Sequence, residues 1–169
     1  MYKVGDRIVY GQAGVMTVVD IREEKVLNEK NTYYVLRAHD AGEGALTFVP
    51  TDNEELVSLM RPLMTKEEIE KMIIAVKESP DIQWIEDTRA RSMVFKKIAD
   101  SSDFTEILRM IRAIEEKITI RTELGKRSYL SDEIIMKKAK KRVYSEFSAV
   151  LDLDYEQTDN YIRYMMSQK

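Results

Sequence analysis

The hydrophobic residues of this 169-residue chain change their spacing at about residue 62, and this change constrains the fold more than any other feature. Before it, apolar residues occur in short runs that are rich in β-branched and aromatic side chains. After it, they recur every three or four residues over long segments. The first pattern is typical of strands and the second of amphipathic helices. The sequence therefore predicts an α+β chain, in which a small β unit precedes an all-α unit.

Four short runs in the first part predict strands, and a fifth short strand is expected near residues 56–59. The predicted strands are 7–10, 14–22, 32–38 and 45–49. The turn-forming residues between them are Gly11 and Gly14, Asn28 to Asn31, and Asp40 to Gly44. Four or five short strands in about 60 residues are too few for a sandwich. They predict a small SH3-like or Tudor-like β-barrel over residues 1–62.

Residues 63–169 predict an all-α helical bundle of five helices joined by short turns. Three of the helix starts have the capping-box spacing, in which a side chain at the cap is followed three residues later by Glu or Gln. The expected starts are Thr65, Trp84, Asp103, Ser131 and Asp154. Pro80 and Gly125 are expected to end the first and third helices.

The composition excludes several classes of site. The chain has no cysteine and one histidine, His39, so it has no disulfide, no thiolate metal site and no multi-histidine zinc site. The glycine-rich phosphate-binding motifs and the nucleophile elbow are also absent. The sequence therefore predicts a protein that is not an enzyme and that uses no metal, no cofactor and no small-molecule substrate.

Neither a membrane nor a secretory pathway is expected for this chain. No apolar run approaches the roughly 20 residues that a membrane-spanning helix needs. The opening "MYKVGDRIVYGQ" lacks the pattern of a signal peptide. We expect a cytoplasmic protein.

The charge is distributed unevenly along the chain. The net charge is −3, which does not indicate a generally basic nucleic-acid binder. Residues 1–64 hold 7 Lys and Arg against 10 Asp and Glu, whereas residues 65–169 hold 20 of each. Any anion-binding surface must therefore be local and must lie in the second part.

The segment "PDIQWIEDTRARSMVFKK" is the strongest candidate for such a surface. It contains the only tryptophan, Trp84, followed by four cations without an acid between Thr88 and Lys97. On a helix, residues seven apart share a face, so Arg89 and Lys96 lie together and Arg91 and Lys97 flank them. Cations in a row can bind phosphates, while an indole presses against exposed bases. The sequence predicts DNA contacts by Trp84, Arg89, Arg91, Lys96 and Lys97.

Other interpretations of these residues remain open. Trp84 could be a buried anchor of the bundle, because tryptophan is highly buried on average. The basic run 137–142 could be a binding face or a solvated face. The chain as a whole could be an RNA-binding module with an SH3-like barrel. It could also be a protein–protein adaptor in which Trp84 anchors the interface.

The whole chain resembles the CarD family of bacterial transcription regulators, of the CarD/CdnL type. Four segments carry the resemblance, in the order in which the family has them. They are "YKVGDRIVYGQAGV", "LTFVPTDNEELVSLMRPLMTKEEIEKM", "QWIEDTRARSMVFKKIADSSD" and "MKKAKKRVYSEFSAVLDLDYEQTDNYI". The third resembles the tryptophan and basic helix of the family.

The resemblance implies a function in two parts. The N-terminal Tudor-like domain, shared with the transcription-repair coupling factor, would dock on the β subunit of RNA polymerase. The helical domain would contact promoter DNA at the upstream edge of the bubble and stabilise the open complex, with Trp84 as the wedge. The protein would then be associated with the nucleoid through polymerase. Arg89 and, by position, Arg91, Lys96 and Lys97 would contact the DNA backbone.

The resemblance also implies a polymerase-binding surface on the β unit. Family members present basic residues there, and Arg22 and Lys25 are the candidates in this chain. Phe48 is a further candidate, because an exposed strand edge near residues 45–49 could add to a sheet of the partner. An alternative places Phe48 in the barrel core.

Overall fold

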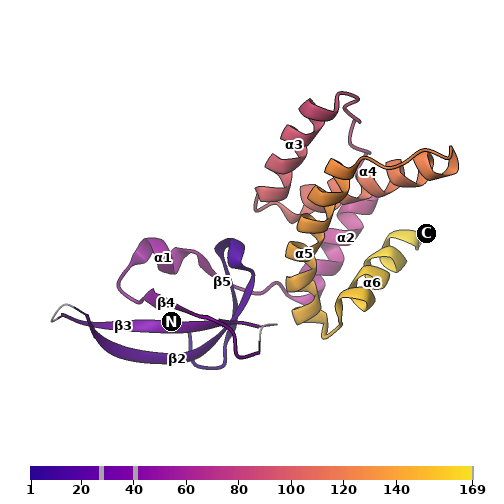
Figure 1. Cartoon of the computed structure of the whole chain (residues 1–169). Coiled ribbons are helices and arrows are strands. Elements are labelled where there is room, and N and C mark those ends of the chain that lie inside the picture. Colours follow the sequence, from indigo (N-terminus) through magenta and orange to yellow (C-terminus); the bar gives the residue numbers. More distant parts are fainter. Residues whose placement is uncertain (27–28, 40–41, 169) are drawn as a thin grey trace. The chain divides into compact units, whose positions relative to one another are not determined.

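The computed structural model describes residues 1–26, 29–39 and 42–168, and it divides into two compact units. The first unit, Met1–Met64, holds the strands, and the second, Thr65–Lys169, holds the long helices (Figure 1). The predicted α+β class is confirmed.

Over the described residues of the first unit, five strands form an antiparallel sheet with the order β4-β3-β2-β1-β5. The strands are β1 (Arg7–Tyr10), β2 (Val15–Val26), β3 (Glu29–Ala38), β4 (Leu46–Pro50) and β5 (Met60–Pro62). A bulge interrupts the pairing of β2 with β3 between Val18 and Asp20. The strands β4 and β5 form the two edges of the sheet, and the pairings of the described residues do not join them. Closure into a barrel therefore stays a prediction.

The segment expected to be a fifth strand near 56–59 is instead mostly helical, so that prediction is wrong. Helix α1 spans Glu54–Ser58, and the side chain of Asn53 caps it by accepting a hydrogen bond of 3.0 Å from the backbone N–H of Leu56. An asparagine cap followed by two acids favours a helix start over a strand. The fifth strand, β5, begins only at Met60. A short 3-10 helix, η1, spans Gly11–Ala13.

The two predicted turns at Asn28–Asn31 and Asp40–Gly44 fall partly outside the described residues, which omit 27–28 and 40–41. Within the described part, Asn31 already belongs to β3.

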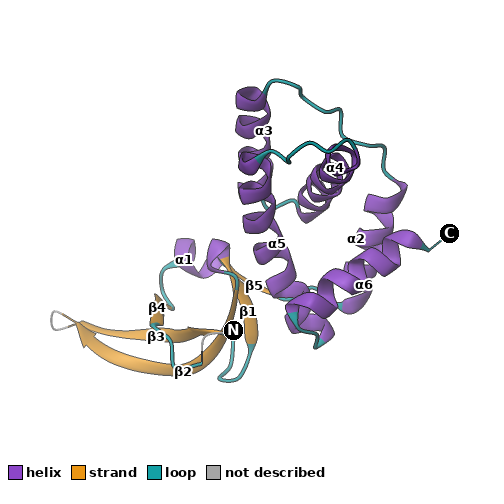
Figure 2. Ribbon diagram, turned by 45° about the vertical axis from the view of Figure 1, so that its right-hand side comes forward, coloured by secondary structure: helices purple, strands orange, loops and turns teal. Residues whose placement is uncertain are grey.

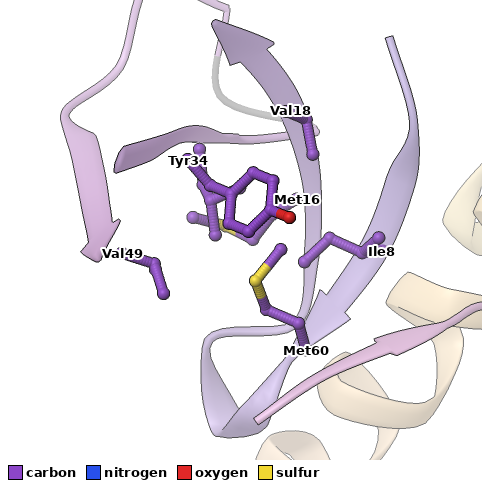
Figure 3. Close-up of a cluster of buried hydrophobic side chains, with 7 residues drawn as sticks. Ile8, Met16, Val18, Tyr34, Val49 and Met60 are labelled. Carbon is purple, nitrogen blue, oxygen red and sulfur yellow. The ribbon is translucent and has the colours of Figure 1, made fainter. Parts of the chain in front are cut away.

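One face of the sheet carries the core of the first unit (Figure 3). Its buried members are Ile8, Met16, Val18, Tyr34, Leu36, Val49 and Met60. Alternation along β4 places Val49 in this core and its neighbour Phe48 on the other side, where Phe48 is 39% exposed. The interpretation of Phe48 as a core residue is therefore wrong.

The described part of the second unit contains five helices, which Figure 2 draws in purple. They are α2 (Lys66–Glu78), α3 (Thr88–Asp100), α4 (Phe104–Glu123), α5 (Leu130–Leu151) and α6 (Tyr155–Ser167). Complete capping boxes open α2 at Thr65 and α6 at Asp154, and Asp103 caps α4. These three predicted starts are confirmed.

Two helix starts differ from their predictions. Helix α3 begins at Thr88 and not at Trp84, because the carboxylate of Asp87 caps it by accepting a 2.7 Å hydrogen bond from the backbone N–H of Ala90. Trp84 therefore lies in the loop before the helix. Helix α5 begins at Leu130, one residue before the expected Ser131.

Charged side chains fasten α5 to its neighbours α4 and α6. The ammonium of Lys140 lies 2.5 Å from Glu115 on α4 and 3.1 Å from Asp159 on α6. Burial raises the pKa of Asp159, but hydrogen bonds from Arg163, Tyr144 and Lys140 outweigh it, so the net effect lowers the pKa. A carboxylate held in this way stays ionised inside the bundle.

The described residues contain neither a membrane-spanning helix nor a cluster of metal ligands. No helix among them is both long and apolar enough to span a bilayer. Nor do these residues bring three or more His, Asp or Glu side chains together as a metal site.

A substitution at the end of α5 tests one point of backbone strain. Asp152 has φ 54° and ψ 47°, a left-handed conformation that glycine adopts without strain. We expect Asp152→Gly to raise the free energy of unfolding by up to about 1 kcal/mol, as measured by urea denaturation. The control Asp152→Ala removes the carboxylate but keeps the strain. An Ala variant as stable as the Gly variant would contradict the explanation.

Candidate nucleic-acid interface

The loop that carries Trp84, residues 79–87, is held by arginines of α4. Arg112 donates hydrogen bonds to the backbone carbonyls of Ser79 (3.1 Å) and Pro80 (3.3 Å), and to the carboxylate of Asp81 (2.9 Å). Arg109 donates a further hydrogen bond of 3.0 Å to the carbonyl of Pro80. These bonds fix the first part of the loop against the bundle.

Arg91, on α3, holds the second part of the loop. Its Nη1 donates hydrogen bonds to the backbone carbonyls of Ile85 (2.7 Å) and Glu86 (3.1 Å). Its Nε and Nη2 each lie 3.0 Å from Oδ2 of Asp132, in the first turn of α5. Arg91 is 0% exposed and Asp132 is 2% exposed. The two residues thus form a buried ion pair that joins the loop, α3 and α5.

The predicted contact of Arg91 with DNA is wrong for this structure. A guanidinium without solvent exposure cannot reach a phosphate, and its donors already have partners in the protein. Arg91 lies on the buried stripe of α3 with Phe95 and Ala99, at i, i+4 and i+8. The spacing with Phe95 and Ala99 marks the buried face, but the counterion that makes burial of a charge possible, Asp132, is 41 residues away in the sequence.

Trp84 is partly buried. This state lies between the two interpretations of the residue, an exposed wedge and a buried anchor of the bundle. The ring meets Phe95 edge-on, with 5.8 Å between the centroids. The guanidinium carbon of Arg91 and the ammonium of Lys117 lie 4.6 and 5.0 Å from the centroid of the ring. The indole Nε1 is buried and has no hydrogen-bond partner among the described residues. The indole is therefore neither free in solvent nor sealed in the core.

Beside the ring lies a narrow crevice that has no room for a water molecule, lined among others by Trp84, Lys117, Tyr129 and Asp132. Asp132, one of the residues that line it, has a buried Oδ1 without a hydrogen-bond partner among the described residues. A crevice without room for a water molecule cannot hold a nucleotide or a cofactor, whose pockets measure about 300 Å³ or more.

The other three predicted cations lie on the surface. Arg89, Lys96 and Lys97 are exposed on α3, and none of them pairs with an acid within the part of the chain that the structure describes. Met93, which is 68% exposed, lies between Arg89 and Lys96 in the sequence of α3. The structure thus leaves three cations of α3 available for an anionic partner.

The basic run 137–142 on α5 is divided between the surface and the interior. Lys137 and Lys141 are exposed, whereas Lys140 is buried in the ion pairs described above. Lys138 lies 2.8 Å from Asp100 of α3, and Arg142 donates hydrogen bonds to carbonyls at the C-terminal end of α3. Part of the run is therefore a solvated face, and part of it forms polar contacts between α3 and α5.

The residues predicted to bind polymerase lie on the first unit. Arg22 of β2 and Phe48 of β4 come together, with the guanidinium carbon of Arg22 at 5.2 Å from the centroid of the Phe48 ring. Tyr33 meets the same ring edge-on at 6.3 Å. Arg22 also forms an ion pair of 2.9 Å with Glu24. Lys25 is exposed further along β2, opposite Lys30.

Comparison with known families identifies the first unit. Residues 2–64 match the family model described as the CarD-like/TRCF RID domain. The match ends where the second unit begins. No curated protein matches the chain.

Removal of Asp132 tests the buried ion pair. We expect Asp132→Ala to lower the free energy of unfolding by about 3 to 5 kcal/mol, because Arg91 would then be buried without a counterion. The measurement is chemical denaturation followed by circular dichroism. The control Glu106→Ala breaks the partly exposed pair with Arg109 and should cost less than about 1 kcal/mol. Equal losses in the two variants would contradict this assignment.

Proposed function

We propose that this chain, whose residues 2–64 match the CarD-like/TRCF RID domain, is a CarD-like regulator that interacts with RNA polymerase and stabilises the open promoter complex. In this proposal the second unit contacts promoter DNA at the upstream edge of the transcription bubble. The protein acts in the cytoplasm, on the nucleoid, through polymerase. It is a regulator and not an enzyme.

The observation that supports this proposal is the combination of a partly exposed indole with unpaired cations in one short segment. Trp84 precedes α3, and α3 presents Arg89, Lys96 and Lys97 to solvent. Cations without acidic partners favour phosphate contacts, and an indole can stack on a base that has lost its pair. Lys137 and Lys141 on the neighbouring α5 would extend the same basic surface.

The proposed effect on promoter opening depends on the difference in binding free energy between melted and intact DNA. A protein shifts promoter melting only by as much as it binds the melted state better than the duplex. Stacking of one base on an aromatic side chain contributes about 1–3 kcal/mol. This corresponds to roughly a 5- to 150-fold change in open-complex stability. One indole is therefore sufficient for regulation.

Docking on polymerase explains how a chain with a net charge of −3 can act on DNA. The RID domain, whose partner in this family is the β subunit, would hold the second unit close to the promoter. A tethered unit binds at a high effective concentration, so few phosphate contacts are needed.

We place the polymerase contact on the β4 edge of the sheet. β4 is an edge strand with an exposed aromatic side chain, Phe48, and Arg22 lies against that side chain. An exposed edge can add to a sheet of the partner through backbone hydrogen bonds. Arg22, Phe48 and Lys25 would then supply side-chain contacts beside the added strand.

Replacement of Trp84 tests the proposed wedge. We expect Trp84→Ala to shorten the lifetime of open complexes by about 5-fold or more, measured by competitor challenge of polymerase on a promoter. Binding to polymerase should stay unchanged. Because the ring also packs on Phe95, the variant should lose about 1–3 kcal/mol of stability. The lifetimes must therefore be compared well below the melting temperature.

Trp84→Phe is the matched control, because it keeps an aromatic ring against Phe95. It should retain part of the effect on lifetime. A Trp84→Ala variant that is folded, binds polymerase and supports open complexes like the wild type would refute the wedge.

The ionic-strength dependence tests the cations of α3. On forked promoter DNA, the free protein should bind weakly, and log Kobs should fall linearly with log [salt]. We expect Lys96→Ala/Lys97→Ala to reduce that slope by about 0.9 for each phosphate that a lysine neutralises in the wild type. Lys66→Ala/Lys71→Ala on α2 changes the net charge equally and should leave the slope unchanged. If both double variants alter the slope alike, the effect is one of net charge, and the α3 assignment fails.

A further inference from the structure

Arg91 contacts the loop around Trp84, the tryptophan ring and the start of α5. Its Nη1 binds the two carbonyls that follow the tryptophan, Ile85 and Glu86, and its Nε and Nη2 bind Asp132. The flat guanidinium also lies near two aromatic rings. Its Cζ is 4.6 Å from the centroid of the Trp84 ring and 4.5 Å from that of Tyr129. Arg91 therefore touches both the backbone and the side chain of the tryptophan loop.

Besides Arg91, the indole has ring contacts with Phe95 and Lys117. Its one polar atom, Nε1, has no hydrogen-bond partner in the described part of the chain, so no hydrogen bond fixes the direction of the ring. Among the other ring contacts, Phe95 meets it edge-on. Lys117 contributes a flexible ammonium, and this side chain is also paired with Glu86 at 3.6 Å. Through its pair with Asp132, Arg91 links the ring to the first turns of both α3 and α5.

We propose that Arg91, held by Asp132, is a positioning residue that sets the orientation of Trp84 for its contact with DNA, an inference that rests on the proposed function. A ring fixed in one orientation loses little conformational entropy on binding, so more of the stacking free energy remains for the open complex. Arg91 acts through Trp84 and touches no nucleic acid itself.

The substitution Arg91→Lys separates positioning from charge. Lysine keeps the positive charge, but it is a flexible point charge without the planar fork that binds two carbonyls and a carboxylate together. If Arg91 contributed only charge, the lysine variant would behave like the wild type. If Arg91 positions Trp84, the variant should resemble Trp84→Ala in function.

The only tryptophan of the chain reports its own position. We expect Arg91→Lys to shift the emission of Trp84 to longer wavelength and to increase its quenching by acrylamide in the free protein. On polymerase, the lifetime of the open complex should fall on the order of 5-fold, close to the loss in Trp84→Ala. The salt slope on forked DNA and the affinity for polymerase should not change.

Two further variants control for stability. Ile162→Ala on α6 removes a buried side chain far along the chain from the loop. It should lower the melting temperature without changing the emission of Trp84. Tyr129→Leu removes one aromatic neighbour of the guanidinium but no charge, and it replaces Arg91→Lys if that variant does not fold. It should also shift the emission of Trp84.

The outcomes distinguish the two proposals. Unchanged emission and quenching in Arg91→Lys and Tyr129→Leu would overturn the positioning role, whatever the effect on promoters. The positioning role would also be overturned if Arg91→Lys changed the emission of Trp84 but left the open-complex lifetime normal, while Trp84→Ala shortened that lifetime. If Trp84→Ala itself leaves the lifetime unchanged, the proposed function fails, and a shift of emission in Arg91→Lys would still support the structural link.

Discussion

The buried ion pair between Arg91 and Asp132 determines how the second unit is arranged around its tryptophan. Taking both charges out of water is costly, and the cost is offset only when the geometry satisfies most of their hydrogen bonds. The pair meets this condition by adding two loop carbonyls to the carboxylate. It thereby specifies the alignment of α3 with α5 and the path of the loop in one site. A purely apolar contact would specify neither as strictly.

The cations of the second unit divide into two groups by their partners. Arg91, Arg109, Arg112 and Lys117 are engaged with the loop at 79–87, and Lys140 with α4 and α6. Arg89, Lys96 and Lys97 have no such partner in the described structure. Equal numbers of acids and bases over residues 65–169 are thus compatible with a local basic surface. The net charge of these residues does not reveal this surface, because many of the basic side chains are paired within the fold.

The sequence was sufficient for the features that depend on local chemistry. The change of hydrophobic spacing predicted the α+β class, and the caps at Thr65, Asp103 and Asp154 predicted three helix starts. It failed where two local signals competed, as at Asn53, whose cap favoured a helix over the expected strand. It also failed where a residue depended on a distant partner. The burial of Arg91 follows from Asp132, and the partial burial of Trp84 follows from Arg91 and Lys117.

The strand β4 ends in Pro50, and a proline has no backbone N–H. A foreign strand laid along this edge therefore finds a ladder of only four residues, Leu46 to Val49, before the pairing must stop. Short edges that end in proline resist indefinite stacking of one copy on another. The proline that ends β4 would thus limit how far a strand of a partner pairs with this edge, and it would also prevent the sheet from growing into a fibre.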